Sequence, residues 1–143
     1  MKKTILIAVA FTGCIMACTK GDDNSSVSIV GKWNANTARE KKVDLLNSSN
    51  NHDITQSYAI GSYLDFRNDG KIYGHHAFGT TSFTNDTFFY NLSANKLTII
   101  NSTRTDTNFV SVLTLTNSQL SLYEKNDDIP LALVIESWIN ASR

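Results

Sequence analysis

Histidine and aspartate are the side chains of this sequence with the chemistry for catalysis or metal binding. His75 and His76 are adjacent, and neighbouring residues of a β-strand point to opposite faces, so this pair does not suit one metal ion. His52 precedes Asp53 in a polar stretch that offers no further ligand at the spacing of a known metal site. The sequence therefore predicts no metal site and no cofactor.

The paired aspartates are expected to shape turns. General acid–base chemistry needs two carboxyl groups in a cleft, whereas Asp65 and Asp69 flank one predicted turn, and Asp127 and Asp128 lie in another that begins at Asn126. Aspartates at turns usually accept hydrogen bonds from backbone amides. The chain also contains no nucleophile elbow, Walker loop or zinc-protease motif. We therefore expect a protein that is not an enzyme.

The N-terminus has the pattern of an export signal. Lys2 and Lys3 precede a nearly continuous apolar run from Thr4 to Met16. This run is shorter than the ~20 helical residues that span a bilayer, and it is typical of the central region of a signal peptide.

Two cysteines close this region. Ile15-Met16-Ala17-Cys18 resembles the lipobox of bacterial lipoproteins, which implies cleavage before Cys18 and attachment of lipid to its sulfur. Phe11-Thr12-Gly13-Cys14 is a competing match, and an ordinary secretory signal is the other alternative. Cys18 is preferred because Ile15 suits the lipobox better and a polar stretch begins directly after Cys18.

A polar segment follows the lipobox and is expected to be a flexible tether. Within it, Lys20, Asp22 and Asp23 resemble the charged signal that sends some Bacteroidota lipoproteins to the cell surface, although a plain linker explains them equally well. Loss of the leader changes the net charge from zero to −2, and the absence of a basic stripe argues against nucleic acid as a partner. The expected organisation is a signal peptide (1–17), a lipidated linker (18–28) and one domain (29–143). The protein is expected to be anchored in the outer membrane, on its periplasmic face or at the cell surface.

The domain is expected to be all-β, because short alternating segments are separated by turn residues. The expected strands cover residues 29–39, 58–66, 71–78, 87–92, 96–101, 108–116 and 119–124. A large polar loop, partly helical near residues 41–46, is expected after the first strand. The last segment, 130–140, fits helical and strand spacing about equally; a strand is favoured because an eighth strand would close the sheet. The prediction is an antiparallel up-and-down meander of about eight strands that closes into a small barrel, with a two-sheet sandwich as the alternative.

Four segments together resemble the small lipocalin-like domains of Bacteroidota lipoproteins. They are residues 30–33 (VGKW), 63–71 (YLDFRNDGK), 90–99 (YNLSANKLTI) and 113–122 (LTLTNSQLSL). The resemblance implies an eight-stranded barrel in which Gly31 and Trp33 open the first strand. It also implies that the Trp33 ring packs at the base beneath a basic residue, for which Arg143 and Arg104 both qualify. Asp69 and Gly70 would form the tight turn of a hairpin.

Aromatic residues in the middle of the chain are the candidates for ligand binding. Phe78, Phe83, Phe88 and Tyr90 flank a polar loop, residues 80–86, that is expected to form a rim of the barrel. Aromatic side chains beside such a rim can line a ligand mouth, although core packing also accounts for them. We expect a small apolar or amphipathic ligand. The alternative is an envelope module that docks a protein or glycan partner through the polar residues 47–56.

Overall fold

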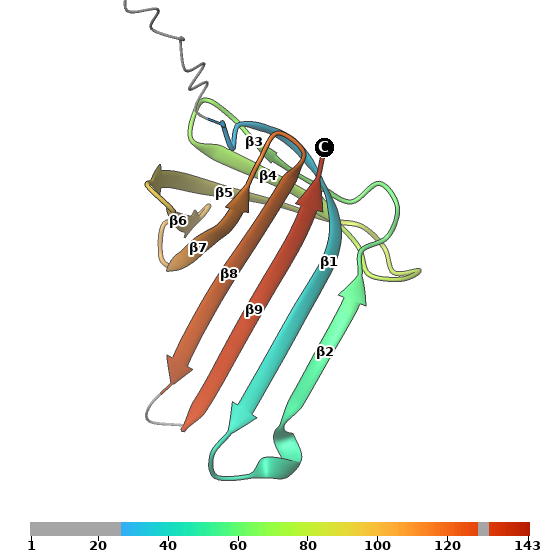
Figure 1. The fold of residues 1–143 in the computed structure, drawn as a ribbon, viewed down its shortest axis with the longest axis vertical. Coiled ribbons are helices and arrows are strands. Elements are labelled where there is room, and N and C mark those ends of the chain that lie inside the picture. Colours follow the sequence, from blue (N-terminus) through green and yellow to red (C-terminus); the bar gives the residue numbers. More distant parts are fainter. Residues whose placement is uncertain (1–26, 129–131) are drawn as a thin grey trace, which may run out of the picture.

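The computed structural model describes residues 27–128 and 132–143, and this part is built from β-strands (Figure 1). The predicted signal peptide, Cys18 and the tether up to residue 26 lie outside the described residues, as do residues 129–131. The strands are β1 (Gly31–Asp44), β2 (His52–Ser57), β3 (Tyr63–Phe66), β4 (Lys71–His76), β5 (Thr84–Ser93), β6 (Lys96–Asn101), β7 (Thr107–Leu115), β8 (Gln119–Asp128) and β9 (Leu133–Ser142). A short 3₁₀ helix, η1 (Ser48–Asn50), follows β1. No helix in these residues is long and apolar enough to cross a bilayer.

Eight of the strands form a closed ring. From β3 to β9 each strand pairs antiparallel with the next, and β1 pairs with both β3 and β9, which closes the barrel. The ninth strand, β2, pairs with β1 beyond the end of β3. The predicted all-β barrel of about eight strands is confirmed, the sandwich alternative is wrong, and the final segment is the strand that closes the ring.

Strand β1 changes partner along its length. Its first residues, Gly31–Asn34, pair with β3, whereas Thr37–Lys42 pair with β2. Between β2 and β3 the chain turns, with the amide of Ser62 donating to the carbonyl of Ala59 at 3.1 Å and Gly61 at a φ of 95°. The predicted continuous strand 58–66 is therefore wrong. Ile60, which the alternation placed on the face of Phe66, is fully exposed at this turn.

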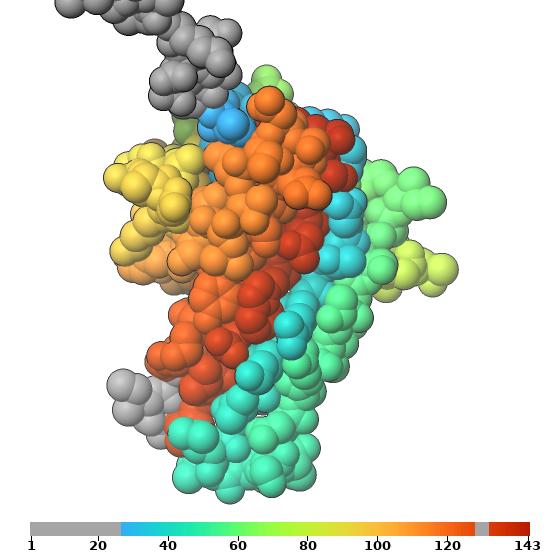
Figure 2. Space-filling view, viewed as in Figure 1, coloured from blue at the N-terminus to red at the C-terminus, as the bar shows by residue number. Residues whose placement is uncertain are grey.

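The strands near the barrel's open end project beyond the ring as a four-stranded sheet, which we call the extension. It comprises β2, Thr37–Asp44 of β1, Leu133–Asn140 of β9 and Ser121–Asp128 of β8. In Figures 1 and 2 these segments run side by side toward the lower end of the molecule.

The extension corrects three sequence-based expectations. Residues 41–44 are strand and not helix, Asn126–Asp128 continue β8 and do not turn, and the large loop shrinks to residues 45–51 because β2 begins at His52. These residues are polar and carry a weak alternation. Their strand conformation depends on backbone pairing with distant segments, which local propensity does not report.

Trp33 and Arg143 fill the base of the barrel. The Trp33 side chain is fully buried, and its indole N–H donates to the carbonyl of Ile29 at 2.7 Å. The Arg143 guanidinium lies 3.9 Å from the centre of the Trp33 ring and donates to the carbonyl of Val30 at 2.6 Å. Arg104, the other candidate from the sequence, lies over Phe89 instead, at 4.6 Å.

The core continues upward from this base. Its buried members come from seven strands and the segment before β1, and they are Ile29, Trp33, Phe66, Ile72, Leu97, Val110, Val112, Leu120, Leu122 and Ala141. At the base Gly31 has a φ of 128°, and a Cβ there would lie 3.1 Å from the Arg143 guanidinium. In the β3–β4 turn Gly70 has a φ of 77°, while the carboxylate of Asp69 accepts from the amide of Lys71 at 3.2 Å.

Removing the guanidinium at the base is expected to destabilise the fold. Arg143→Ala should lower the free energy of unfolding by about 1–2 kcal/mol, because a cation–π contact and charge-assisted hydrogen bonds to backbone carbonyls are lost. Urea unfolding followed by tryptophan fluorescence measures the change. Arg104→Ala is the matched control, since its guanidinium also stacks on a ring but at the surface, and it should change stability by less than about 0.5 kcal/mol. Equal losses in the two variants would contradict the role assigned to Arg143.

Candidate functional site

The inner face of the extension continues the inner wall of the barrel. Leu122 is buried in the core and pairs with Ile139, so the residues in register with this pair also face inward. The alternation places two rows of side chains on this face. The first row is Leu122, Ile139, Ala38 and Gln56, and the second is Glu124, Ser137, Glu40 and Ile54.

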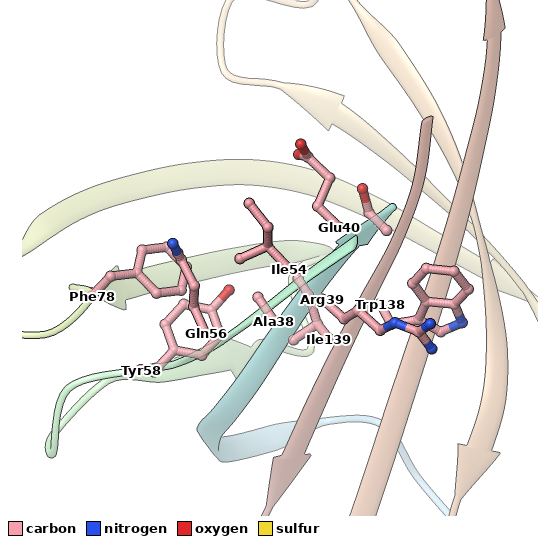
Figure 3. A pocket seen from close by; sticks show the side chains of 10 residues that line it. Ala38, Arg39, Glu40, Ile54, Gln56, Tyr58, Phe78, Trp138 and Ile139 are labelled. Atoms are coloured by element: carbon pink, nitrogen blue, oxygen red, sulfur yellow. The ribbon is translucent and has the colours of Figure 1, made fainter. Parts of the chain in front are cut away.

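A cavity lies against these rows at the open end of the barrel (Figure 3), and we call it the mouth cavity. Its volume is about 290 Å³, and it is lined by the inward side chains Ala38, Glu40, Ile54, Gln56, Tyr58, Phe78, Ser137 and Ile139. Arg39 and Trp138 also border it, but their side chains extend to the opposite face of the sheet (Figure 3).

The deeper wall of the mouth cavity is apolar. A second cavity of about 100 Å³, lined by Ile99, Val110 and Leu122 among others, shares Ser137 and Ile139 with it. At the opposite side the rings of Tyr58 and Phe78 stack with their centres 4.4 Å apart. The opening thus leads from polar side chains at the rim to aliphatic side chains of the core.

Histidine–carboxylate pairs flank the mouth cavity. His52 donates to Glu40 at 2.8 Å, and His76 lies 3.7 Å from Asp86 and edge-on to the ring of Tyr58. Burial raises the pKa of the Tyr58 hydroxyl above its ordinary value. No group of three or more potential metal ligands occurs in the described part of the chain. The arrangement suits binding of a molecule with an apolar portion.

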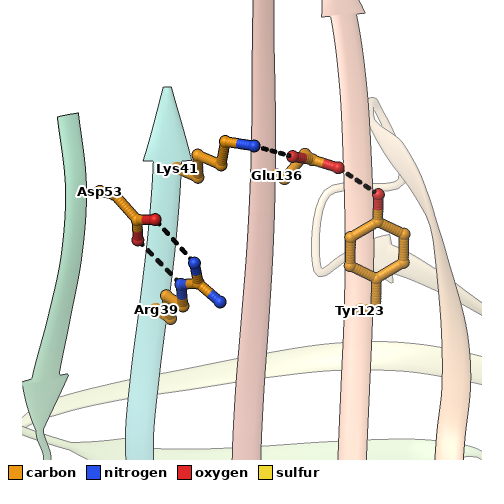
Figure 4. Close-up of polar contacts among 5 residues, drawn as sticks. All are labelled: Arg39, Lys41, Asp53, Tyr123 and Glu136. Carbon is orange, nitrogen blue, oxygen red and sulfur yellow. Dashed lines mark hydrogen bonds and ion pairs between the residues drawn. The ribbon is translucent and has the colours of Figure 1, made fainter. Parts of the chain in front are cut away.

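The outer face of the extension carries a network that joins its strands (Figure 4). Arg39 of β1 donates twice to Asp53 of β2, at 2.8 and 2.6 Å, and Lys41 of β1 lies 3.5 Å from Glu136 of β9. The hydroxyl of Tyr123 in β8 donates to the same Glu136 at 2.9 Å (Figure 4). All four strands are linked in this way.

Trp138 adds an aromatic layer to this face. Its ring lies 5.2 Å from that of Tyr123 and 4.8 Å from the Arg39 guanidinium. These contacts join β1, β8 and β9 on the outer face of the extension, opposite the mouth cavity.

The four aromatic residues predicted to bind a ligand lie in different places. Phe78 lines the mouth cavity, whereas Phe88 packs on the inner wall against the core. Tyr90 meets Phe66 edge-to-face at 5.3 Å and donates its hydroxyl to the carbonyl of Arg67 at 3.0 Å. Phe83 lies on the outside and stacks on His75 at 4.3 Å.

The structure brings only Phe78 of these four to the cavity. The two adjacent histidines point to opposite faces, His75 outward and His76 inward, as the alternation predicted. The expected rim loop 80–86 is shorter than predicted, because β5 begins at Thr84.

Most lining residues of the mouth cavity were missed in the sequence. Glu40, Ile54 and Gln56 lie in the stretch interpreted as a loop, and Ser137 and Ile139 lie in a segment whose period was ambiguous. The isolated Ile54 within a polar run is the one local signal of an inward face, and it is weak.

An antiparallel ring of eight strands, plugged by a Trp–Arg pair at one end and hollow at the other, defines a small cup-shaped barrel. The chain belongs to the lipocalin-like domain family, whose model matches residues 29–122, more than half of the 143 residues. A deswapped triple mutant of bovine odorant binding protein is 10% identical with a TM-score of 0.45, covering 79% of this chain and 72% of that chain. Aphrodisin, a sex pheromone from female hamster, is 11% identical with a TM-score of 0.46, covering 81% and 75%. No curated protein matches the chain.

Acid is expected to weaken the extension through Asp53. The hydrogen bonds from Arg39 lower the pKa of this carboxyl below its ordinary value of about 3.9. A carboxylate with a lowered pKa contributes its stability above the unfolded-state pKa and loses it as the pH falls through the folded-state value. Unfolding measured from pH 6 to pH 2 should therefore show a smaller loss of stability below about pH 4 in Asp53→Asn than in the wild type. Asp106→Asn, at a loop aspartate without an ion pair in the described residues, should follow the wild-type curve. Parallel curves for wild type and Asp53→Asn would contradict this assignment.

Proposed function

We propose that this chain is a lipid-anchored envelope protein whose barrel binds a small apolar or amphipathic molecule in the mouth cavity. The observation that carries the proposal is the uneven filling of the barrel. Trp33, Phe66, Leu97 and Leu120 fill its base completely, whereas its other end holds a cavity. An eight-stranded barrel has room for its own side chains or for one small ligand. Here side chains fill one end of the barrel, and the cavity at the other end leaves room for a ligand.

The chemistry of the mouth cavity supports an amphipathic ligand. The cavity and its apolar neighbour together reach the lower part of the ~300–1,000 Å³ range of small-molecule sites. Ile139 and Leu122 offer an aliphatic floor, while Glu40, Gln56 and Ser137 offer hydrogen-bonding groups at the rim. A molecule with an apolar body and a polar end would satisfy both regions. Release by movement of the rim needs no reaction.

The anchor is proposed from the sequence. The lipobox-like Ile15-Met16-Ala17-Cys18 and the polar tether after it indicate lipid on Cys18, and several acyl chains at about 0.8 kcal/mol per buried methylene hold a protein stably on a membrane. Ile29 packs beside Trp33 at the base, so a tether enters at the end opposite the mouth cavity. An anchored barrel would present its mouth away from the attachment point.

Filling the mouth cavity is expected to abolish ligand uptake. The full chain in lauryldimethylamine oxide is titrated with N-phenyl-1-naphthylamine, an apolar fluorescent probe, and Ala38→Phe should bind it at least 10-fold more weakly because the new ring occupies the site. Thr55→Phe adds the same ring to the outer face of the neighbouring strand and corrects for partition of the probe into micelles. Uptake that is the same in wild type, Ala38→Phe and Thr55→Phe would reject this site.

The mature N-terminus tests the anchor. Mass spectrometry of the chain purified from bacterial membranes should show a protein that starts at Cys18 and carries the added mass of acyl chains. Cys18→Ser should remove the chain from the membrane fraction, whereas Cys14→Ser should leave it there. An unmodified start at another residue, or loss of anchoring in Cys14→Ser alone, would overturn the assignment to Cys18.

A further inference from the structure

A second concave site lies on the outer face of β3, β4 and β5. Phe66 and Ile72 of these strands are buried in the core, so Tyr63, Asp65 and Tyr73, which alternate with them, face outward. A groove of about 410 Å³ runs between these side chains and those of Arg67, Asn85 and Thr87, and we call it the outer groove. It opens on the surface opposite to the barrel interior and shares no lining residue with the mouth cavity.

Two aromatic residues, Tyr63 and Tyr73, line the outer groove, and Tyr63 belongs to a row of stacked rings beside it. Tyr63 stacks between the ammonium of Lys32, 3.6 Å from its ring centre, and the ring of His75 at 5.2 Å. His75 in turn stacks on Phe83 at 4.3 Å with an angle of 5° between the planes. Tyr73 of β4, which pairs with Asp65 of β3, also lines the groove and is 38% exposed. Neither Tyr73 nor Phe83 belongs to the barrel core.

Planar polar groups lie beside these rings, and they include no unpaired cation. Arg67, the one basic residue that lines the groove, donates to Asp65 at 3.0 Å, and Asp86 is a second acidic lining residue. The imidazole Nδ1 of His75 donates to the carboxamide oxygen of Asn85 at 2.7 Å, which fixes the orientation of that amide and leaves its NH₂ group free to donate. The site thus combines exposed ring surface with hydrogen-bond donors and acceptors.

We infer that the outer groove binds a neutral oligosaccharide. A pyranose ring has an apolar C–H face, which packs on an aromatic ring, and hydroxyl groups at its edge that donate and accept at once. Tyr73 supplies the ring, and Asp65, Arg67 and Asn85 supply hydrogen-bond partners, charged ones being the stronger. An acidic ligand is disfavoured because Asp65 already neutralises Arg67. This inference stands apart from the proposed ligand of the mouth cavity.

Calorimetric titration of the full chain in lauryldimethylamine oxide, a detergent without a sugar headgroup, tests the site. The probes are maltohexaose, cellohexaose, xylohexaose and mannohexaose, with a heparin hexasaccharide as the anionic arm. At least one neutral probe should bind saturably. Tyr73→Ala should weaken that binding at least 10-fold, Asn85→Ala at least 3-fold, and Tyr73→Phe less than 3-fold because the ring remains.

Two controls make the outcome decisive. Phe109→Ala removes another outward ring, on β7, that is 58% exposed and lies under Lys96 of β6. This variant should leave sugar affinity unchanged. Ala38→Phe, which fills the mouth cavity, should also leave it unchanged. The inference is overturned if no neutral probe binds, if heparin binds more tightly than every neutral probe, or if Phe109→Ala or Ala38→Phe weakens binding as much as Tyr73→Ala.

Discussion

The pairing of β1 with β9 is the constraint on which the rest of the structure depends. These strands lie at opposite ends of the described chain, and they pair antiparallel from Asn34 and Ser142 to Asp44 and Leu133. Closing so long a loop is entropically unfavourable, although the cost rises only slowly with length. The closure removes the free edges of β1 and β9 that an open sheet would expose. It also carries Arg143 to the ring of Trp33, so the plug at the base exists only because the ring closes.

The same pairing creates the hollow end. Because β1 and β9 extend past the end of β3, only β2 and β8 accompany them among the described strands, and a cavity lies against their inner side. A sheet with one unpacked face needs stabilisation from the other, and the contacts of Arg39, Trp138, Tyr123 and Glu136 provide it. The surface around Ile54 and Ile139 can therefore stay uncovered beside the cavity. The network of polar and aromatic contacts and the cavity thus lie on opposite faces of one sheet.

The parts of the fold that were predictable from the sequence are those fixed by neighbouring residues. Asp69-Gly70 specifies its turn locally, and the strand Lys96–Asn101 between two turn signals has the predicted bounds. The extension was not predictable, since β2 and the end of β1 are polar and become strands by pairing with each other and with β9. The choice between Arg143 and Arg104 at the base also depended on tertiary contacts. For the same reason the sequence missed Glu40 and Ser137, which line the mouth cavity together with Phe78, one of its four aromatic candidates.

The two ends of the described chain lie away from both concave sites. Ile29 and Arg143 both lie at the plugged base, where Arg143 donates to backbone carbonyls just before β1. Any force exerted through a tether would reach the barrel at its most completely packed point, which is also where the first and last segments hold each other. The mouth cavity and the outer groove lie on other surfaces, and their side chains are not required to hold these ends together. The contacts that close the barrel at its base are therefore independent of the side chains that line either cavity.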